Sequence, residues 1–413
     1  MAKLYKARIV DAILDEYLEA LPAVLLVGPR ASGKTTTAIR RAKTVLRVDK
    51  PEVAAAIVND PDALLASCEP LTAIDEWQLA PGVLGAVKRD VDTTAGFGRF
   101  LLTGSSRADL QQEGWPATGR VVRVPMWPMG VKERIGDVRA KSIIDVLFDA
   151  DFDKVPTSPN VFGIRDYIEL ALQSGFPDVE SQANERVRRG WLASYIEQIV
   201  LRDAPLAGQE RDPQRLRSYL QAIAANSAEA VNHKTLYDTA QISRMTGLAY
   251  DGLLESLFVT ERLPAWSTNR LKLIGRTPKR HLIEPALMGP LLRVDERVII
   301  RDARLIGALM DSFVVAQFRP ELDAADSSAS MFHLRRSDGN AEVDLLLEGP
   351  AGQLVAIEIK AASAPDLAMT KHFRWLRDSL PDRFALGVIF HTGSRPFVLD
   401  EKIWALPIST IWS

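Results

Sequence analysis

The sequence is poor in cysteine, and this scarcity excludes several kinds of site. Cys68 is the single cysteine among 413 residues, so no disulfide can form within the chain and no cysteine-based zinc site is possible. The five histidines are scattered and lack the spacing of metal ligands. A chain with so little cysteine is typical of a reducing compartment, and we expect a cytoplasmic protein.

Long apolar runs and an excess of one charge are also absent. Acidic residues interrupt the N-terminal segment, unlike the apolar core of a signal peptide. No stretch approaches the roughly 18 apolar residues of a transmembrane helix, so we expect no membrane partner. The 51 Lys and Arg nearly balance the 53 Asp and Glu, which excludes a uniformly basic nucleic-acid coat protein but leaves room for a local basic patch. The length predicts two to four domains.

What the sequence does contain is a phosphate-binding loop. An apolar run at 23–27 predicts a buried strand, and the next eight residues follow the pattern G-x-x-x-x-G-K-[ST] before a predicted helix. Glycines let the backbone turn its N–H groups toward phosphate oxygens, and the helix adds its positive dipole end. We expect Lys34 to reach the β- and γ-phosphates and Thr35 to bind Mg²⁺; the alternative is a chance glycine-rich turn. The residues expected to hold ATP or ADP are Gly28, Pro29, Arg30, Ala31, Ser32, Gly33, Lys34, Thr35 and Thr36.

Two later apolar segments end in polar residues that suit the same site. The first leads into Asp75, a candidate ligand of Mg²⁺, and Glu76, a candidate base that polarises the attacking water. The second ends in Thr103 and Ser105, either of which could bond the γ-phosphate or that water. Ligands of open α/β sheets lie at the carboxyl ends of the strands, where all these side chains are expected. The alternative for the acidic pair is a helix cap or a solvated pair.

Arg120 is a candidate arginine finger that would act on the nucleotide of a neighbouring subunit. This role would require a homo-oligomer, at least a dimer. A structural arginine on the surface fits the sequence equally well.

Together these motifs resemble the AAA+ family, and specifically prokaryotic ATPases fused to a C-terminal domain of unknown function. The resemblance rests on GPRASGKTT, IDEWQ, FLLTGSS and TGR, and continues in SGFPDV, WLASYIEQIVLRDA, GVIFHTGSRP and ALPISTIW. It implies a P-loop domain that hydrolyses ATP with Mg²⁺. The loop departs from the family at Ala31-Ser32, where Gln-Val is usual; this is harmless because the backbone does the binding.

The segment 211–300 has a helix–turn–helix outline. Leu216, Leu220 and Ile223 recur at helical spacing, two short helical patterns follow around a glycine turn, and a β-hairpin is expected from about residue 258 to 283. The resemblance implies a winged helix here.

A basic stretch at 262–280 lies within the expected hairpin. It contains six positive residues and no acidic one: Arg262, Arg270, Lys272, Arg276, Lys279 and Arg280. This charge of +6 could neutralise several DNA phosphates with salt-dependent affinity. Winged helices also serve as packing or dimerisation modules, and charged wings are often merely solvated, so both interpretations are open.

Carboxylates near the C-terminus form a third motif. Residues 340–361 predict two strands around a Gly-Pro-Ala-Gly turn. Asp344 lies on the first, while Glu358 and Lys360 lie two apart on the second and share a face. Two acids and a lysine could bind Mg²⁺ and position a water for phosphodiester cleavage.

This set resembles the PD-(D/E)xK nuclease fold, which implies a further metal-binding acid at Asp311 on the preceding helix, where the family usually has Glu. We expect Glu342 to point to the opposite face from Asp344. Three alternatives are open: an active nuclease, an inactive scaffold that only binds DNA, and a surface ion pair of Glu358 with Lys360.

The predicted fold is α/β in four parts. They are an AAA+-type P-loop domain with a parallel sheet at 1–130, a helical lid or connector at 131–210, a winged helix at 211–300 and a PD-(D/E)xK nuclease-like α/β domain at 301–413. We expect an ATP-binding and ATP-hydrolysing protein that acts on DNA. The rival hypotheses are a nucleotide-gated DNA-binding switch without cleavage and an ATPase that acts on a protein partner.

Overall fold

The computed structural model forms two compact units, each described separately below. The described residues are 5–104, 119–135, 137–150, 160–203, 212–268, 277–336 and 341–413. The N-terminal unit comprises Met1–Pro128 and the short segments Phe176–Asp178 and Glu255–Phe258. The C-terminal unit comprises Met129–Gly175, Val179–Leu254 and Val259–Ser413. The finer division into four parts stays a prediction.

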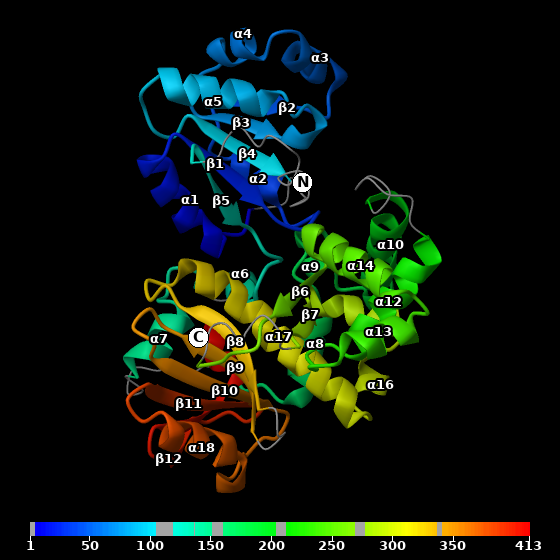
Figure 1. Cartoon of the computed structure of the whole chain (residues 1–413), viewed down its shortest axis with the longest axis vertical. Coiled ribbons are helices and arrows are strands. Elements are labelled where there is room, and N and C mark those ends of the chain that lie inside the picture. The colour runs from blue at the N-terminus through cyan, green and yellow to red at the C-terminus, as the bar shows by residue number, and fades with distance from the viewer. Residues whose placement is uncertain are drawn as a thin grey trace. The chain divides into compact units, whose positions relative to one another are not determined.

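A five-stranded parallel sheet is the centre of the N-terminal unit (Figure 1). Its strand order is β2-β3-β4-β1-β5, and every neighbouring pair is parallel. The strands are β1 (Ala23–Val27), β2 (Thr44–Arg47), β3 (Thr72–Asp75), β4 (Phe100–Gly104) and β5 (Val121–Pro125). The three central strands, β1, β3 and β4, are buried along their whole length, which explains why their sequences are nearly continuous apolar runs.

In the described part of this unit, helix α1 (Ile9–Ala20) precedes the sheet, and the strands are connected by α2 (Lys34–Ile39), α3 (Pro51–Asn59), α4 (Pro61–Ala66), a 3-10 turn at Trp77–Leu79 and α5 (Val83–Thr93). Val10, Leu14 and Leu18 follow one another at intervals of four along α1 and are buried. They share a core with Val24 and Leu101 of the sheet, so α1 covers the sheet with a single apolar stripe.

The C-terminal unit begins with short helices: α6 (Val131–Ile135), α7 (Ile143–Asp149), α8 (Ile164–Leu172), α9 (Pro177–Glu180), whose first two residues belong to the N-terminal unit, α10 (Glu185–Gln198) and a π-helical turn at Ile199–Asp203. In the described part of the chain, no helix combines the length and the apolar character needed to cross a membrane.

Three helices and a hairpin follow: α12 (Pro213–Ala225), α13 (His233–Thr239), α14 (Arg244–Ser256), β6 (Thr260–Leu263) and β7 (Lys279–Leu282). Asp212 caps α12 by accepting bonds from the amides of Gln214 and Arg215, and Pro213 occupies the first turn, where its missing N–H costs nothing. The two strands pair in antiparallel fashion. This is the expected order of elements, and the assignment to the winged-helix family stays a prediction. The short helices α15 (Met288–Leu292) and α16 (Glu296–Ile299) come next.

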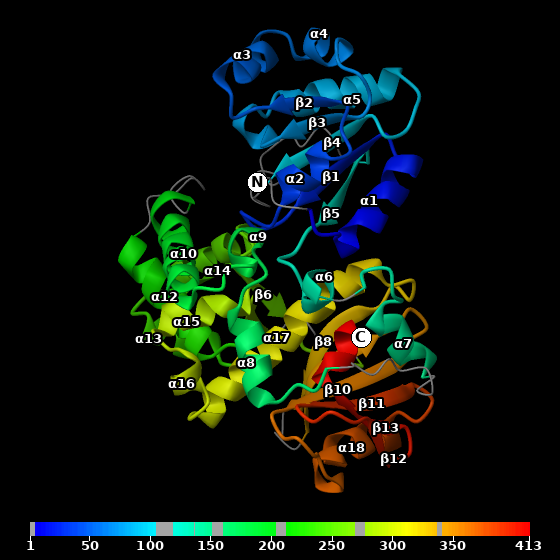
Figure 2. The same ribbon diagram turned by 180° about the vertical axis from the view of Figure 1, so that it is seen from behind.

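A six-stranded mixed sheet forms the rest of this unit, in the order β12-β13-β11-β10-β9-β8 (Figure 2). Its elements are α17 (Ala303–Ala324), β8 (Ser330–Arg335), β9 (Glu342–Glu348), β10 (Leu354–Lys360), α18 (Lys371–Ser379), β11 (Phe384–His391), β12 (Phe397–Asp400) and β13 (Ile403–Pro407). Phe373 and Leu376 of α18 share a core with Leu346 and Ala356. Helix α18 therefore covers the face of the sheet that these residues share.

The residues just after β6 form backbone hydrogen bonds with β8, the edge strand of this sheet. The amide of Trp266 donates to the carbonyl of His333 at 2.6 Å, and the amide of His333 donates to the carbonyl of Pro264 at 2.9 Å. The Trp266 side chain is buried in the same core as α18. The hairpin formed by β6 and β7 and the six-stranded sheet are thus held together by backbone bonds as well as by packing.

Candidate functional site

The phosphate-binding loop connects β1 to α2 at the carboxyl edge of the parallel sheet. Gly33 adopts φ 100° and ψ 10°, a left-handed conformation that glycine tolerates best. A Cβ atom on Gly28 would lie 2.1 Å from the carbonyl oxygen of Met126, so no side chain fits there. Both glycines of the motif are therefore required by the backbone path that a phosphate cradle needs.

Lys34 lies inside this loop with 6% of its surface exposed. Its Nζ donates to the carbonyl oxygens of Gly28 at 3.0 Å and Pro29 at 2.7 Å. Burial lowers the pKa of Lys34 to about 8, although the carboxylates of Glu76 and Asp75 oppose the shift. The loop thus holds a buried ammonium against neutral carbonyls, an arrangement that a phosphate would improve.

Asp75 connects the loop helix to the neighbouring strand. Its Oδ1 accepts from Thr35 Oγ1 at 2.7 Å and from Thr103 Oγ1 at 2.5 Å. The parallel register places Asp75 beside Thr103 across β3 and β4. A hydroxyl and a carboxylate side by side form an oxygen donor set of the kind that Mg²⁺ prefers, so the predicted magnesium residues fit this ion.

Glu76 is held in a strained conformation. It adopts φ 56° and ψ 46°, which is the left-handed region and is unusual for a residue with a side chain. Its amide donates to Thr103 Oγ1 at 3.3 Å, and its Oε2 accepts from Gln78 Nε2. The candidate base is therefore close to the loop, but its carboxylate is hydrogen-bonded to Gln78.

No role was predicted for Gln78, the last residue of the IDEWQ motif, or for Arg8, which lies outside the motifs. Arg8 is 4% exposed. Its Nη1 donates to the carbonyl of Ser32 at 2.8 Å and its Nη2 to the carbonyl of Trp127 at 2.7 Å. Arg8 thereby fixes the outer part of the phosphate-binding loop against the segment that follows β5.

Two other predicted residues have no demonstrated place in this site. Arg120 Nε lies 2.8 Å from Asp92 Oδ1 in an exposed ion pair, and its role as an arginine finger stays a prediction. Ser105 lies outside the described residues.

In the C-terminal unit, the predicted acids come together from three elements. We name Asp311 of α17, Asp344 of β9 and Glu358 of β10 the carboxylate cluster. Lys360 Nζ lies 2.6 Å from Glu358 Oε2. The charges of Asp344, Glu358 and Lys360 all act on the carboxyl of Asp311, which places the four predicted residues in one site.

Lys279 is the unexpected member of this site. It is 2% exposed, and its Nζ lies 3.0 Å from Asp344 Oδ1 and 3.5 Å from Glu342 Oε1. The expectation that Glu342 and Asp344 point to opposite faces is wrong. Residues two apart on a strand share a face, and one ammonium bonds both of them.

The electrostatics of the site follow from burial and these lysines. Burial and the nearby charge of Asp344 raise the pKa of Asp311 well above its ordinary value. Burial would also raise the pKa of Asp344, but the Lys279 and Lys360 ammoniums lower it overall. Burial and Asp344 raise the pKa of Glu358. Asp344 is therefore the fixed negative charge of the cluster.

Part of the basic stretch faces inward, contrary to its expected role on DNA. Arg280 is 3% exposed, and its Nη2 donates to Asp251 Oδ2 at 2.9 Å. The hydroxyls of Tyr219 and Tyr237 donate to the same carboxylate. Lys279 and Arg280 are thus committed to internal carboxylates, because buried charges require partners. Arg262 is exposed, while Arg270, Lys272 and Arg276 lie outside the described residues.

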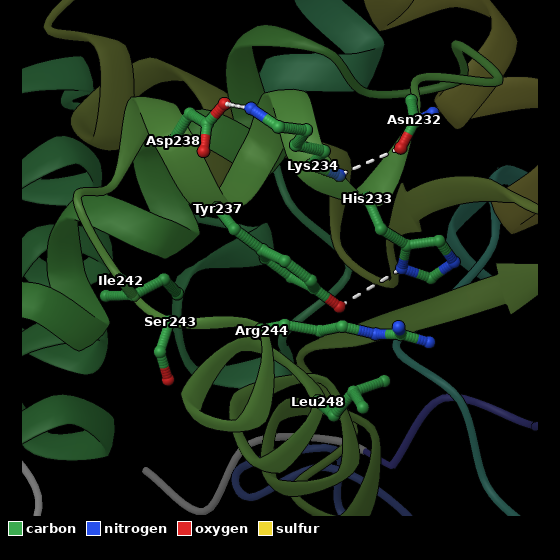
Figure 3. A pocket seen from close by; sticks show the side chains of 9 residues that line it. All are labelled: Asn232, His233, Lys234, Tyr237, Asp238, Ile242, Ser243, Arg244 and Leu248. Atoms are coloured by element: carbon green, nitrogen blue, oxygen red, sulfur yellow. Dashed lines mark hydrogen bonds and ion pairs between the residues drawn. The ribbon is translucent and has the colours of Figure 1, made fainter.

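A pocket of about 640 Å³ lies between α13 and the start of α14 (Figure 3). The residues that line it are Asn232, His233, Lys234, Tyr237, Asp238, Ile242, Ser243, Arg244 and Leu248. Arg244 extends below Tyr237 toward His233, whose Nδ1 lies 3.1 Å from the Tyr237 hydroxyl (Figure 3). A Cβ atom on Gly247 would lie 2.2 Å from the Tyr237 ring, so glycine permits the close packing of the two helices. The sequence did not predict this pocket.

Three protein-family models match separate segments of the chain. An AAA domain matches residues 21–135, a domain of unknown function (DUF8612) matches residues 164–298, and another (DUF4143) matches residues 306–411. The chain is 25% identical to the uncharacterized proteins Rv2008c of Mycobacterium tuberculosis and Mb2031c of Mycobacterium bovis, over 99% of this chain and 85% of each relative.

Among solved structures, the chain is similar to the Walker-type ATPase PABY2304 of Pyrococcus abyssi, with a TM-score of 0.42 and 14% identity over 70% of this chain and 96% of that one. The family match coincides with the phosphate-binding loop and the parallel sheet. Residues 21–135 therefore form a P-loop domain of the AAA type, a kind of domain that binds and hydrolyses ATP.

Proposed function

We propose that this protein is an ATPase that uses Mg²⁺, with the active site at the carboxyl edge of the parallel sheet. The observation that carries the proposal is the bond of 2.7 Å from Thr35 Oγ1 to Asp75 Oδ1 beside the loop that holds Lys34. This bond joins the two residues expected to hold a magnesium ion, and it lies beside Lys34, the residue expected to bind the phosphates.

Each residue has a separate task in this proposal. The backbone amides of the loop and the Lys34 ammonium bind the phosphates, and Lys34 exchanges its carbonyl partners for phosphate oxygens. Thr35 and Asp75 would hold Mg²⁺, which neutralises charge on the phosphate oxygens. Glu76 accepts a proton from the attacking water after its carboxylate leaves Gln78, and Thr103 orients that water.

The test is ATP turnover by the full chain with Lys34→Ala. We expect turnover to fall by at least about 100-fold, the effect of removing one cationic donor from a phosphate site. Lys88→Ala is the matched control, since Lys88 is an exposed lysine of the same unit that pairs with Asp92. Turnover that survives Lys34→Ala would contradict the assignment of the loop.

A second function, contact with DNA, is supported by the pocket between α13 and α14. Lys234 and Arg244 line it, and both are exposed. Positive groups at a concave surface attract phosphates. We infer that this surface, rather than the buried Lys279 and Arg280, supplies the phosphate contacts of the middle segment.

Fluorescence anisotropy of labelled duplex DNA at several salt concentrations tests this contact. Arg244→Ala should weaken binding several-fold and reduce the salt slope by about 1. Arg215→Ala is the control, because Arg215 is an exposed arginine of α12 that pairs with Asp212. If the wild-type protein does not bind DNA at low salt, the proposal of a protein partner takes its place.

A further inference from the structure

We propose that Lys279 is the resident cation of the carboxylate cluster, and that its ammonium takes the place of the divalent metal that a PD-(D/E)xK site would require. The cluster then serves to fasten the β6–β7 hairpin to the six-stranded sheet. This inference is independent of the proposed ATP hydrolysis.

Lys279 belongs to the β6–β7 hairpin, which lies outside the predicted nuclease-like segment 301–413, and its ammonium contacts the carboxylate cluster from there. Lys279 is the first residue of β7 and pairs with Leu263 of β6. The chain after β6 is itself bonded to β8 through Pro264, Trp266 and His333. Both strands of the hairpin are therefore anchored, so the ammonium is held at Asp344 by the backbone and not only by its own long side chain.

Three carboxylate oxygens of Asp344 and Glu358 that a metal would use already have partners within the chain. Asp344 Oδ1 accepts from Lys279 Nζ at 3.0 Å, and Asp344 Oδ2 accepts from the amide of Ile359 at 3.2 Å. Glu358 Oε2 accepts from Lys360 Nζ at 2.6 Å. In the described part of the chain, no three His, Cys, Asp or Glu side chains are arranged to hold a metal ion. The residues do not fit a divalent ion while Lys279 is in place.

The charge balance of the site agrees with this geometry. The ammoniums of the buried Lys279 and the half-buried Lys360 face the three acids of the cluster, and the pKa of Asp311 is raised well above its ordinary value, which favours the neutral form. Burial alone would lower the pKa of Lys279, but Asp344, Asp311 and Glu342 raise it overall. Adding a divalent ion would bring two more positive charges beside a buried ammonium, which is unfavourable at low dielectric.

Titration with Mn²⁺ followed by electron paramagnetic resonance tests the proposal on the full chain without nucleotide. Wild-type protein should show no Mn²⁺ binding that depends on Asp344, up to about 1 mM, the range of weak sites for hard cations. Lys279→Ala should gain one Mn²⁺ per chain. The double variant Lys279→Ala with Asp344→Asn should lose it again, which assigns the new ion to the cluster and separates it from any ion at the phosphate-binding loop.

Two controls separate the charge of Lys279 from its size. Lys279→Arg keeps the positive charge and should not gain the ion, and Lys371→Ala removes an exposed lysine of α18 and should behave as wild type. Thermal unfolding of each variant verifies that it is folded.

Two results would overturn the proposal. The first is Mn²⁺ binding by the wild-type protein that Asp344→Asn abolishes, because metal and lysine would then share the site. This result requires no variant of Lys279, so it is decisive even if Lys279→Ala does not fold. The second is a folded Lys279→Ala protein that gains no Mn²⁺.

Discussion

The two units each bury a lysine among polar groups, but the two lysines differ in their partners. Lys34 lies against two carbonyl oxygens, and burial lowers its pKa to about 8. Lys279 lies against two carboxylates, which raise its pKa in spite of burial. Among the described residues, the first ammonium has no counter-ion in direct contact, and it can gain one from a ligand. The second has its counter-ions within the chain.

This difference separates a site suited to binding an anionic ligand from a site suited to stabilising the fold. An ammonium bonded only to neutral oxygens gains electrostatic free energy when phosphates arrive, whereas an ammonium already paired with carboxylates gains little from a new ligand. Both lysines lie in segments that the sequence marks as candidates for binding phosphates, so the distinction depends on which atoms contact each Nζ. The predictions below test it, from the largest expected effect to the smallest.

Removing the base of the ligand-binding site should have the largest effect. Glu76→Gln keeps the size of the side chain but cannot accept a proton, so we expect ATP turnover to fall by about 1000-fold, within the range for general bases. The affinity for a fluorescent ATP analogue should stay within about threefold. Turnover and binding assays check both expectations. A large loss of affinity would mean that Glu76 supports the loop rather than the chemistry.

Removing the counter-ion of the fold-stabilising site should destabilise the C-terminal unit. Lys279→Ala leaves Asp344 buried without its nearest ammonium, and we expect the free energy of unfolding to fall by about 3 kcal/mol, as for a broken buried ion pair. Urea denaturation measures this change. Lys234→Ala is the control, because it breaks an exposed pair with Asp238 on α13 and should cost less than about 1 kcal/mol. Equal effects of the two variants would contradict the comparison.

The affinity for ATP should depend on pH through Lys34. Its pKa of about 8 means that the free protein loses the ammonium as the pH rises through 8. Phosphates bind the ammonium form, so affinity should be constant below pH 7 and fall about tenfold per pH unit above 8. Calorimetry in buffers of different ionisation enthalpy should detect proton uptake on binding near pH 8.5. Affinity that is constant from pH 7 to 9.5 would mean that Lys34 keeps its proton without a ligand.

The smallest effect is expected at Gln78, which bonds the carboxylate of Glu76. Gln78→Ala removes one hydrogen bond from a neutral amide to the carboxylate of Glu76, worth about 2 kcal/mol, and frees the base. We expect turnover to change by no more than about fivefold while the affinity for ATP is unchanged. Steady-state kinetics with Gln78→Glu as a second variant would show whether the bond or the polar side chain is responsible. A change above 100-fold would make Gln78 part of the reaction itself.

The sequence could predict which side chains gather at the phosphate-binding loop because the parts of this site are local, while their roles toward a nucleotide stay predictions. The loop from Gly28 to Thr35 is one continuous motif, and the register of parallel strands brings Asp75 beside Thr103. The bonds of Gln78 and Arg8 could not be predicted: Gln78 ends the IDEWQ motif, but neither its hydrogen bond to Glu76 nor the two bonds of Arg8 to backbone carbonyls follow from residue spacing.

The sequence predicted the carboxylate cluster but not its cation. Lys279 and Asp344 are 65 residues apart, and counting charges over 262–280 does not distinguish an exposed lysine from a buried one. Counting charges in this way also included Arg280 among the residues available to DNA, although Arg280 is buried and forms an ion pair with the buried Asp251. Burial is decided by tertiary packing, which local composition does not contain.

The backbone bonds between Trp266 and His333 also limit how segments of this protein can be exchanged by recombination during evolution. Separate family models match residues 164–298 and 306–411, as if the two segments were interchangeable modules. A recombination event that moved only the second segment would transfer a sheet whose edge strand β8 has lost its cover and whose Asp344 has lost Lys279. Exposed edge strands promote aggregation. Selection should therefore keep the two segments together, so that they evolve as one module.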